Sequence, residues 1–262
     1  MKKFVRHRFT LVEILVSMAV FSILLTLMMQ FFSGARTLWT ANEKRTVVYS
    51  DASVALDLMS TLLQSTYCTF DNAGANQTLF EIDNTSPDNN KIYFNSNSRM
   101  NLSGGAVRYL SFQRTQQAGE NLGDNILVLT VFNDLDPDFS RYFWEFNMED
   151  GKNDLTSVRG NLKGKLNISS LPSSGTPPAN AKILLRNVTG LEFTPIHEDG
   201  NQADLTKTPF AIKIKLSLME SEAKLREWRD MPDNPDDPNA KKDFKAQNEY
   251  TFYRTVWLGK RD

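Results

Sequence analysis

A single acidic residue, Glu13, interrupts the most apolar stretch of the chain, and its chemistry needs an explanation. From Phe9 to Phe32 the sequence contains no other charged residue. A carboxylate at the centre of a membrane helix costs about 2.5–3.5 kcal/mol, whereas each Leu, Ile, Phe or Val contributes only about 0.3–0.6 kcal/mol. A carboxylate inside a membrane is by default a functional residue with a partner. We therefore predict that Glu13 pairs with a positive group, because such pairing makes a buried carboxylate tolerable.

A second cluster of carboxylates, near the C-terminal end, has oxygen atoms that could bind Ca²⁺, an ion that takes about six to eight oxygen ligands. The cluster consists of Asp230, Asp233, Asp236 and Asp237. It lacks the Asp-x-Asp-x-Asp-Gly order and the terminal Glu of an EF-hand, and the prolines between its members favour an extended, solvated loop. We therefore predict no metal site. The weak candidates for metal ligands are Asp233, Asp236 and Asp237.

Catalytic side chains are scarce in this chain. His7 and His197 are its two histidines, so a Ser-His-Asp arrangement or a two-histidine metal helix has few candidates. Cys68 is the only cysteine, which excludes an intramolecular disulfide and a multi-cysteine metal centre. His197 precedes the turn signal Gly200-Asn201 and is expected in a surface turn, whereas Cys68 is expected to be a small buried side chain. We predict no enzymatic activity and no cofactor.

The overall charge gives no support for nucleic-acid binding. The chain has 30 Lys and Arg against 31 Asp and Glu, for a formal net charge of -1. No polybasic surface is expected from this balance, so nucleic acid is not a predicted partner. With 262 residues the chain is long enough to form one or two domains with a core of their own.

The apolar stretch from Phe9 to Phe32 is long enough to cross a membrane. It corresponds to a helix of about 36 Å, which exceeds the ~30 Å hydrocarbon core of a bilayer. A cleaved secretory signal would have a shorter apolar region and an Ala-x-Ala site, and a plain single-pass anchor would not explain Glu13. The basic residues before the stretch predict a cytoplasmic N-terminus and an extracytoplasmic remainder; they are Lys2, Lys3, Arg6 and Arg8.

The basic leader, the run Phe9-Thr10-Leu11-Val12-Glu13 and the long apolar stretch together resemble the class III signal of type IV pilins and pseudopilins. The resemblance implies that a prepilin peptidase cuts between Arg8 and Phe9 and that the new Phe9 amine is N-methylated. It also implies that Glu13 acts in assembly, by pairing with the Phe9 ammonium of a neighbouring subunit. This chain has Arg8 where the family usually has Gly before the cut.

The helical pattern continues beyond the membrane stretch, to about Tyr67. Apolar residues recur there at spacings of three and four, and no proline occurs before Pro87. We therefore expect the second half of the same helix to be amphipathic, with Val54, Leu58 and Leu62 covered by a sheet.

From about Phe70 onward, short β-rich runs alternate with Asn, Asp, Gly and Ser clusters, which predicts a domain that is mostly antiparallel sheet. In the clearest run, apolar residues from Ile212 to Leu218 alternate with Lys213, Lys215 and Ser217, so one face is expected to be buried and the other wet. Loops are expected at 161–181 and 230–240, and Trp228 is interpreted as a loop anchor or a partner contact. The predicted strands are Lys91–Asn95, Val107–Gln113, Ile126–Phe132, Arg141–Asn147, Leu191–Ile196, Phe210–Met219 and Tyr250–Leu258.

Three C-terminal segments resemble the J-type minor pseudopilins of type II secretion: Leu184–Phe193, Pro209–Leu216 and Tyr253–Leu258, in that order. The resemblance implies an α+β, pilin-like fold with a long N-terminal helix packed on an antiparallel β-sheet domain. The expected parts are a cleaved basic leader (1–8), a transmembrane helix (9–32), the amphipathic half of the same helix (33–68) and a β-rich periplasmic domain (69–262).

The resemblance further implies a pseudopilin-like subunit of the bacterial inner membrane that assembles with homologous subunits into a pseudopilus or its tip in protein export. Its C-terminal domain would lie in the periplasm or in an extracytoplasmic filament. The expected partners are prepilin peptidase, other pseudopilins or minor pilins, the inner-membrane assembly platform and membrane lipid. Two alternatives fit the same features: a minor pilin of a type IV pilus used in adhesion or DNA uptake, and a single-pass membrane protein with an extracytoplasmic binding domain.

Overall fold

The computed structural model describes residues 11–66, 80–83, 90–96, 108–117, 125–133, 164, 166–167, 170–171, 180–197, 209–232 and 239–258. Several predicted features lie outside these residues: the basic leader with the Arg8–Phe9 cleavage position, Cys68, the strand Arg141–Asn147, and the aspartates Asp233, Asp236 and Asp237. Within the described residues a long N-terminal apolar helix is followed by antiparallel sheets, so the α+β class is confirmed.

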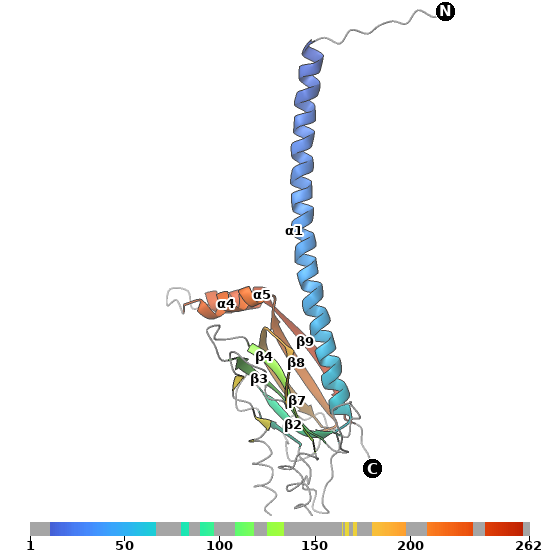
Figure 1. Ribbon diagram of the computed structural model, residues 1–262, viewed down its shortest axis with the longest axis vertical. Helices are drawn as coiled ribbons and strands as arrows, with labels where there is room; N and C mark the ends of the chain where they lie inside the picture. Colours follow the sequence, from blue (N-terminus) through green and yellow to red (C-terminus); the bar gives the residue numbers. More distant parts are fainter. Residues whose placement is uncertain are drawn as a thin grey trace, which may run out of the picture. The chain divides into compact units, whose positions relative to one another are not determined.

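The helix α1 runs without interruption from Leu11 to Gln64 (Figure 1). Gly34 does not break it, and a Cβ atom at that position would meet nothing within 4 Å. The helix ends before the predicted limit near Tyr67. Two residues after the end of α1, Thr66 forms an isolated antiparallel bridge with Ser96, so the backbone is no longer helical there.

The chain divides into two units, Met1–Val47 and Val48–Asp262, and α1 contributes to both. In the first unit every described residue from Leu11 to Thr40 is exposed. In the second unit α1 buries one side, at helical spacings of three and four. The buried residues there are Ala52, Ala55, Leu56, Met59, Ser60, Leu62 and Leu63.

The predicted contacts of this second half of α1 are correct only in part. Leu62 is buried and Leu58 is half-buried, as expected. The prediction for Val54 is wrong, because its side chain is 67% exposed. Residues two apart on a helix are rotated by about 200°, so Val54 faces away from the side that buries Ala52 and Leu56.

The first sheet is built from strands in the order β1-β2-β3-β4-β6, with neighbours antiparallel, and β5 pairs in parallel with β3. The predicted strands at 91–95, 107–113 and 126–132 correspond to β2, β3 and β4, although β3 extends beyond its predicted end. The bounds are β1 Phe80–Asp83, β2 Lys91–Ser96, β3 Arg108–Gln117, β4 Asn125–Asn133, β5 Ser170–Leu171 and β6 Ala181–Leu185.

The second sheet has the order β7-β8-β9 and is antiparallel throughout. Its strands are β7 Val188–Ile196, β8 Ala211–Met219 and β9 Glu249–Trp257, close to the three predicted there. The connection from β6 to β7 passes through Asn187, which has a positive φ of 61°. Asn tolerates this left-handed conformation better than most residues, as a tight turn requires.

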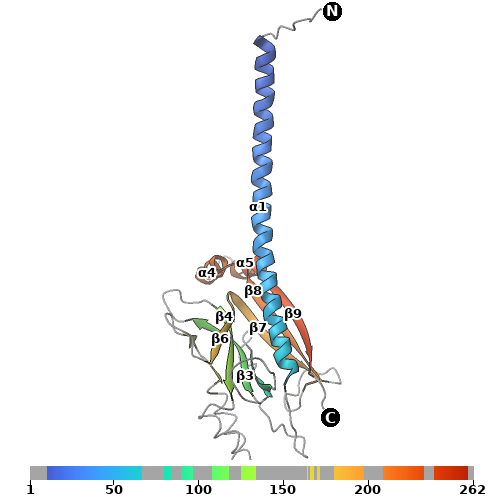
Figure 2. The ribbon, with the colours of Figure 1, turned by 45° about the vertical axis from the view of Figure 1, so that its right-hand side comes forward.

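The core of the second unit joins one face of each sheet to the buried side of α1. In β8 the residues Ile212, Ile214, Leu216 and Leu218 are buried, which confirms the predicted buried face. Phe94 of β2 stacks on Phe112 of β3, with ring centroids 5.7 Å apart. Figure 2 shows the C-terminal part of α1 passing close to β9, and the ring of Tyr49 lies 5.1 Å from that of Phe252.

Two helices occur between β8 and β9 that the sequence analysis did not predict: α4 Glu222–Asp230 and α5 Ala240–Asn248. Trp228 belongs to α4, so its interpretation as a loop residue is wrong; the Nζ atom of Lys245 lies 5.5 Å from its ring. Ser217 is only 4% exposed, and its hydroxyl lies 3.1 Å from that of Thr251 on β9, which corrects the prediction of a wet face at that position.

The sequence analysis also missed three short strands. The strands β5 and β6 begin within the predicted loop 161–181, and β1 precedes the first predicted strand. Leu166 of the same predicted loop is fully buried. The side chains of Ser111 and Gln113 each donate a hydrogen bond, at 3.2 Å, to its carbonyl oxygen. Part of this segment is therefore fixed against the first sheet.

Candidate functional site on the first half of α1

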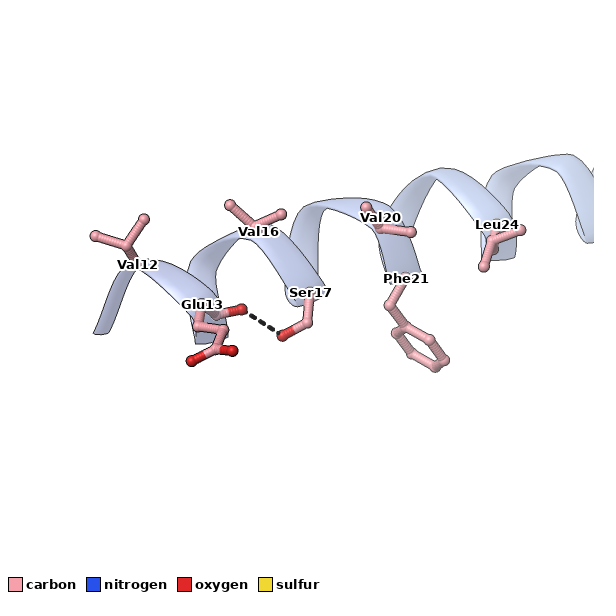
Figure 3. Close-up of a pocket in the computed structure, with 7 residues that line it drawn as sticks. All are labelled: Val12, Glu13, Val16, Ser17, Val20, Phe21 and Leu24. Atoms are coloured by element: carbon pink, nitrogen blue, oxygen red, sulfur yellow. Dashed lines mark hydrogen bonds between the residues drawn. The ribbon is translucent and has the colours of Figure 1, made fainter. Parts of the chain in front are cut away.

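Seven side chains on one side of α1 line a shallow pocket that contains the only carboxylate of the apolar stretch. The apolar residues Val12, Val16, Val20 and Leu24 recur every four residues, and beside them run Glu13, Ser17 and Phe21 at the same spacing (Figure 3). Residues four apart lie nearly above one another on a helix. The pocket is therefore a strip along one helix, with a carboxylate at its N-terminal end.

Glu13 lies in the first turn of α1 as the structure describes it. Figure 3 shows its side chain projecting from the helix on the same side as the Phe21 ring. The carboxylate therefore projects from the surface of the helix.

The three hydroxyl side chains described in this stretch form hydrogen bonds within the helix itself. The Ser17 hydroxyl donates to the backbone carbonyl oxygens of Glu13 and Ile14, at 2.9 Å in each case. The hydroxyls of Ser22 and Thr26 likewise donate to carbonyls four residues earlier, at 2.8 and 2.9 Å. Such bonds remove the need for water around these groups, so the stretch suits a hydrocarbon environment in spite of its hydroxyls.

Length and composition also suit a membrane. The most apolar 18-residue window of α1 has a mean hydropathy of 2.4, and none of it is buried. Along α1 the next charged residue after Glu13 is Arg36, and the two are separated by about 35 Å of helix. Trp39 follows and is 76% exposed, as is typical of aromatic residues at a membrane interface. This helix is therefore able to span a bilayer.

The structure brings together only part of the predicted site. Glu13 is described, but Arg8 and Phe9 are not, so the predicted cleavage and the pairing of Glu13 with the Phe9 amine stay predictions. Ser17 and Phe21 were not singled out from the sequence. Their spacing of four and eight residues from Glu13 is the signal that could have identified them.

The other candidate residues do not form a recognisable site in the described part of the chain. Asp230 ends α4, and its carboxylate lies 3.1 Å from Arg229 Nε. No group of three His, Cys, Asp or Glu among the described residues could hold a metal ion. His197, expected in a surface turn, directly follows β7 and is half-buried, and its Nε2 atom has no hydrogen-bond partner in the described region.

One titratable group of the second unit has a strongly shifted pKa. Tyr93 of β2 is 2% exposed, and burial, assisted by the negative charges of Asp83 and Glu81, raises its pKa from 10.0 to about 12. The phenol is therefore neutral at physiological pH, and its shift reflects burial in the sheet rather than catalytic chemistry.

The sequence matches no model of a known protein family and no characterised protein.

Proposed function

We propose that this chain is a pseudopilin-like subunit that is anchored in the bacterial inner membrane and assembles with homologous subunits into a pseudopilus or its tip. The observation that carries the proposal is the combination of Glu13 with a helix half that is exposed on every side. A carboxylate is unfavourable on an isolated apolar helix in a membrane. A helix that packs against similar helices can pair its carboxylate with a positive group of a neighbour.

The fold of the second unit supports the same proposal. A membrane anchor alone requires only the apolar half of α1, but α1 continues as one helix to Gln64 and becomes part of the core of a sheet domain. The apolar half and the part of α1 that enters the sheet core belong to the same helix, as expected for a subunit that packs through its helix and displays its domain. The pilin-like character of this arrangement rests on the resemblance described above.

In this proposal Glu13 acts in assembly and no residue acts in catalysis. The Phe9 ammonium, produced by cleavage after Arg8, would enter the hydrocarbon region with the subunit. Pairing with the Glu13 carboxylate of a neighbour would neutralise both groups. The partners are a prepilin peptidase, homologous subunits, the membrane assembly platform and lipid, and the domain would lie outside the cytoplasm.

The first experiment determines the mature N-terminus. The full chain is expressed with a prepilin peptidase, and its N-terminal peptide is identified by mass spectrometry. We expect a chain that begins with a methylated Phe9, and Arg8→Gly should accelerate cleavage if Arg8 slows it. Recovery of the intact N-terminus from both versions would contradict processing by this peptidase.

The second experiment separates assembly from membrane insertion. Glu13→Ala removes a charge from the apolar stretch, so insertion should be at least as efficient. Association with partner subunits should fail, since stripping one member from a buried ion pair typically costs about 3–5 kcal/mol. Glu13→Gln should resemble Glu13→Ala if charge is decisive, and Glu13→Asp should be intermediate.

The matched control is Glu43→Ala, which makes the same substitution on an exposed part of α1 beyond the apolar stretch. Membrane fractionation measures insertion, and cross-linking with co-expressed homologous subunits measures assembly. If Glu13→Ala and Glu43→Ala associate equally well, Glu13 has no role in assembly. A single-pass protein with an extracytoplasmic binding domain would then be the better account.

A further inference from the structure

The strand β9 lies at the edge of the second sheet. It pairs with β8 on one side, and no described strand pairs with it on the other. The pairing with β8 is regular over the whole strand, from Met219 opposite Glu249 to Ala211 opposite Trp257. The backbone of β9 therefore has one edge whose hydrogen-bonding groups are not used by a strand of the described structure.

The register identifies the residues that present these groups. The amide of Leu258, just beyond β9, donates to the carbonyl oxygen of Phe210 at 3.0 Å. In an antiparallel ladder hydrogen-bonded and non-hydrogen-bonded pairs alternate, so the even-numbered residues of β9 bond to β8. The backbone N–H and C=O groups that point away from β8 belong to the odd-numbered residues, among which Thr251, Tyr253, Thr255 and Trp257 have exposed side chains.

The same four residues carry the side chains that stand away from the core. Tyr253 and Trp257 are 59% and 56% exposed, and the Trp257 ring makes an edge contact with Phe210, with centroids 5.1 Å apart. Even-numbered side chains of β9 instead contact α1, since the Tyr49 ring lies against the rings of Tyr250 and Phe252.

Three features that often prevent strand addition are absent from β9. Exposed edge strands are commonly protected by proline, lysine or a bulge, and β9 has none of these over its nine residues. Its two charged residues are engaged elsewhere: Arg254 Nη2 lies 2.9 Å from Asp57 Oδ1, and Glu249 Oε1 lies 3.5 Å from Lys245 Nζ.

The neighbouring strand adds a positive charge to this edge. On β8 the Lys215 ammonium pairs with Glu192. The Lys213 ammonium lies 5.1 Å from the centre of the Tyr253 ring, and no carboxylate of the described residues pairs with it. This ammonium lies on the face of the sheet that carries the Tyr253 ring, so it would attract a carboxylate on the same face of an added strand.

We propose that β9 binds an extended, acidic segment of another polypeptide as an additional strand of the second sheet. The backbone groups of Thr251, Tyr253, Thr255 and Trp257 would form the ladder, Tyr253 and Trp257 would pack against the side chains of the added strand, and Lys213 would select the acidic residue. Strand addition of this kind derives its affinity from main-chain hydrogen bonds and its specificity from alternate side chains. The inference depends on neither membrane anchoring nor filament assembly.

The test uses the full chain in detergent micelles and a fluorescent heptapeptide in which valine alternates with threonine around a central glutamate. Binding is measured by fluorescence anisotropy, and amide hydrogen exchange of the protein is followed by NMR. We expect the peptide to slow exchange of the four outward amides at least about tenfold, and to leave the amides of Phe252, Arg254 and Val256 unchanged.

Thr255→Pro tests the edge from the side of the protein. Proline removes the outward N–H of residue 255 but no hydrogen bond to β8, so peptide affinity should fall at least about tenfold. The matched control, Thr255→Val, keeps the N–H and should bind within about twofold of the parent. Circular dichroism reports whether both variants are folded.

Two peptide variants test the same interaction without altering the protein. N-methylation of alternate peptide amides along one edge should abolish binding, because those N–H groups can no longer donate. Replacing the central glutamate with lysine should weaken binding to the parent and favour binding to Lys213→Glu. The proposal is overturned if the acidic peptide does not bind, if its N-methylated form binds equally well, or if the outward amides gain no protection.

Discussion

The two halves of α1 are parts of one continuous helix, yet they have opposite surroundings. From Leu11 to Thr40 every described residue is exposed, whereas from Ala52 to Leu63 one side is buried in the core of the second unit. The difference follows from how polar residues are distributed. A helix that is apolar all round requires an apolar environment on every side, and a helix with one apolar side requires a partner on that side only. Backbone hydrogen bonding is the same in both halves, so helix formation by itself does not determine what each half contacts.

The largest expected effect comes from truncating the same residue type in each half. Leu63 is fully buried and Leu24 is 54% exposed. Leu63→Ala should lower the free energy of unfolding of the second unit by about 2–5 kcal/mol, because it leaves a cavity. Leu24→Ala should change it by less than about 0.5 kcal/mol. Urea unfolding of the full chain in detergent micelles, followed by near-ultraviolet circular dichroism, measures both; equal losses would contradict the division into two halves.

A smaller effect is expected from alkaline pH, and only in the second unit. Because burial raises the pKa of Tyr93 from 10.0 to about 12, the folded protein retains the phenol proton where the unfolded chain loses it. Its contribution to stability is therefore complete below pH 10 and is lost as the pH rises from 10 to 12, by about 2–3 kcal/mol.

The matched variant for this titration is Tyr93→Phe, which removes the ionisable group. Urea unfolding at a series of pH values should show a steeper loss of stability in the parent than in the variant. Hydrogen exchange should show that the first half of α1, embedded in micelles, remains protected throughout. Parallel pH profiles for parent and variant would show that Tyr93 does not titrate with the fold.

The smallest expected effect concerns charged residues on the two halves of α1. The carboxylate of Asp57 lies 2.9 Å from Arg254, and both side chains are at least half exposed. Asp57→Asn should lower the free energy of unfolding by no more than about 1 kcal/mol, and less at high salt. Glu43→Gln, on the first half, should have no measurable effect. A loss above this range for Asp57→Asn would mean that the pair positions α1 on β9 rather than adding a weak surface attraction.

Much of the fold was predictable because the relevant signals are local. The apolar stretch, the continuation of α1 and the strands β2, β3, β4, β7, β8 and β9 all follow from periodicity and from the absence of proline, and the buried face of β8 follows from strict alternation. Of the candidate site, Glu13 was identified from its charge alone, whereas Ser17 and Phe21 became apparent only when the side of the helix was known.

The sequence by itself determined where the chain is helical or extended and which stretch is apolar enough for a membrane, because these properties depend on neighbouring residues. Only the tertiary structure decided that Val54 faces away from the core, that Ser217 is buried, and that β9 is left at an edge of the described sheet. Each of these depends on contacts between residues far apart in the chain. A periodic pattern identifies an apolar side, but the residues that cover it are brought there by the rest of the fold.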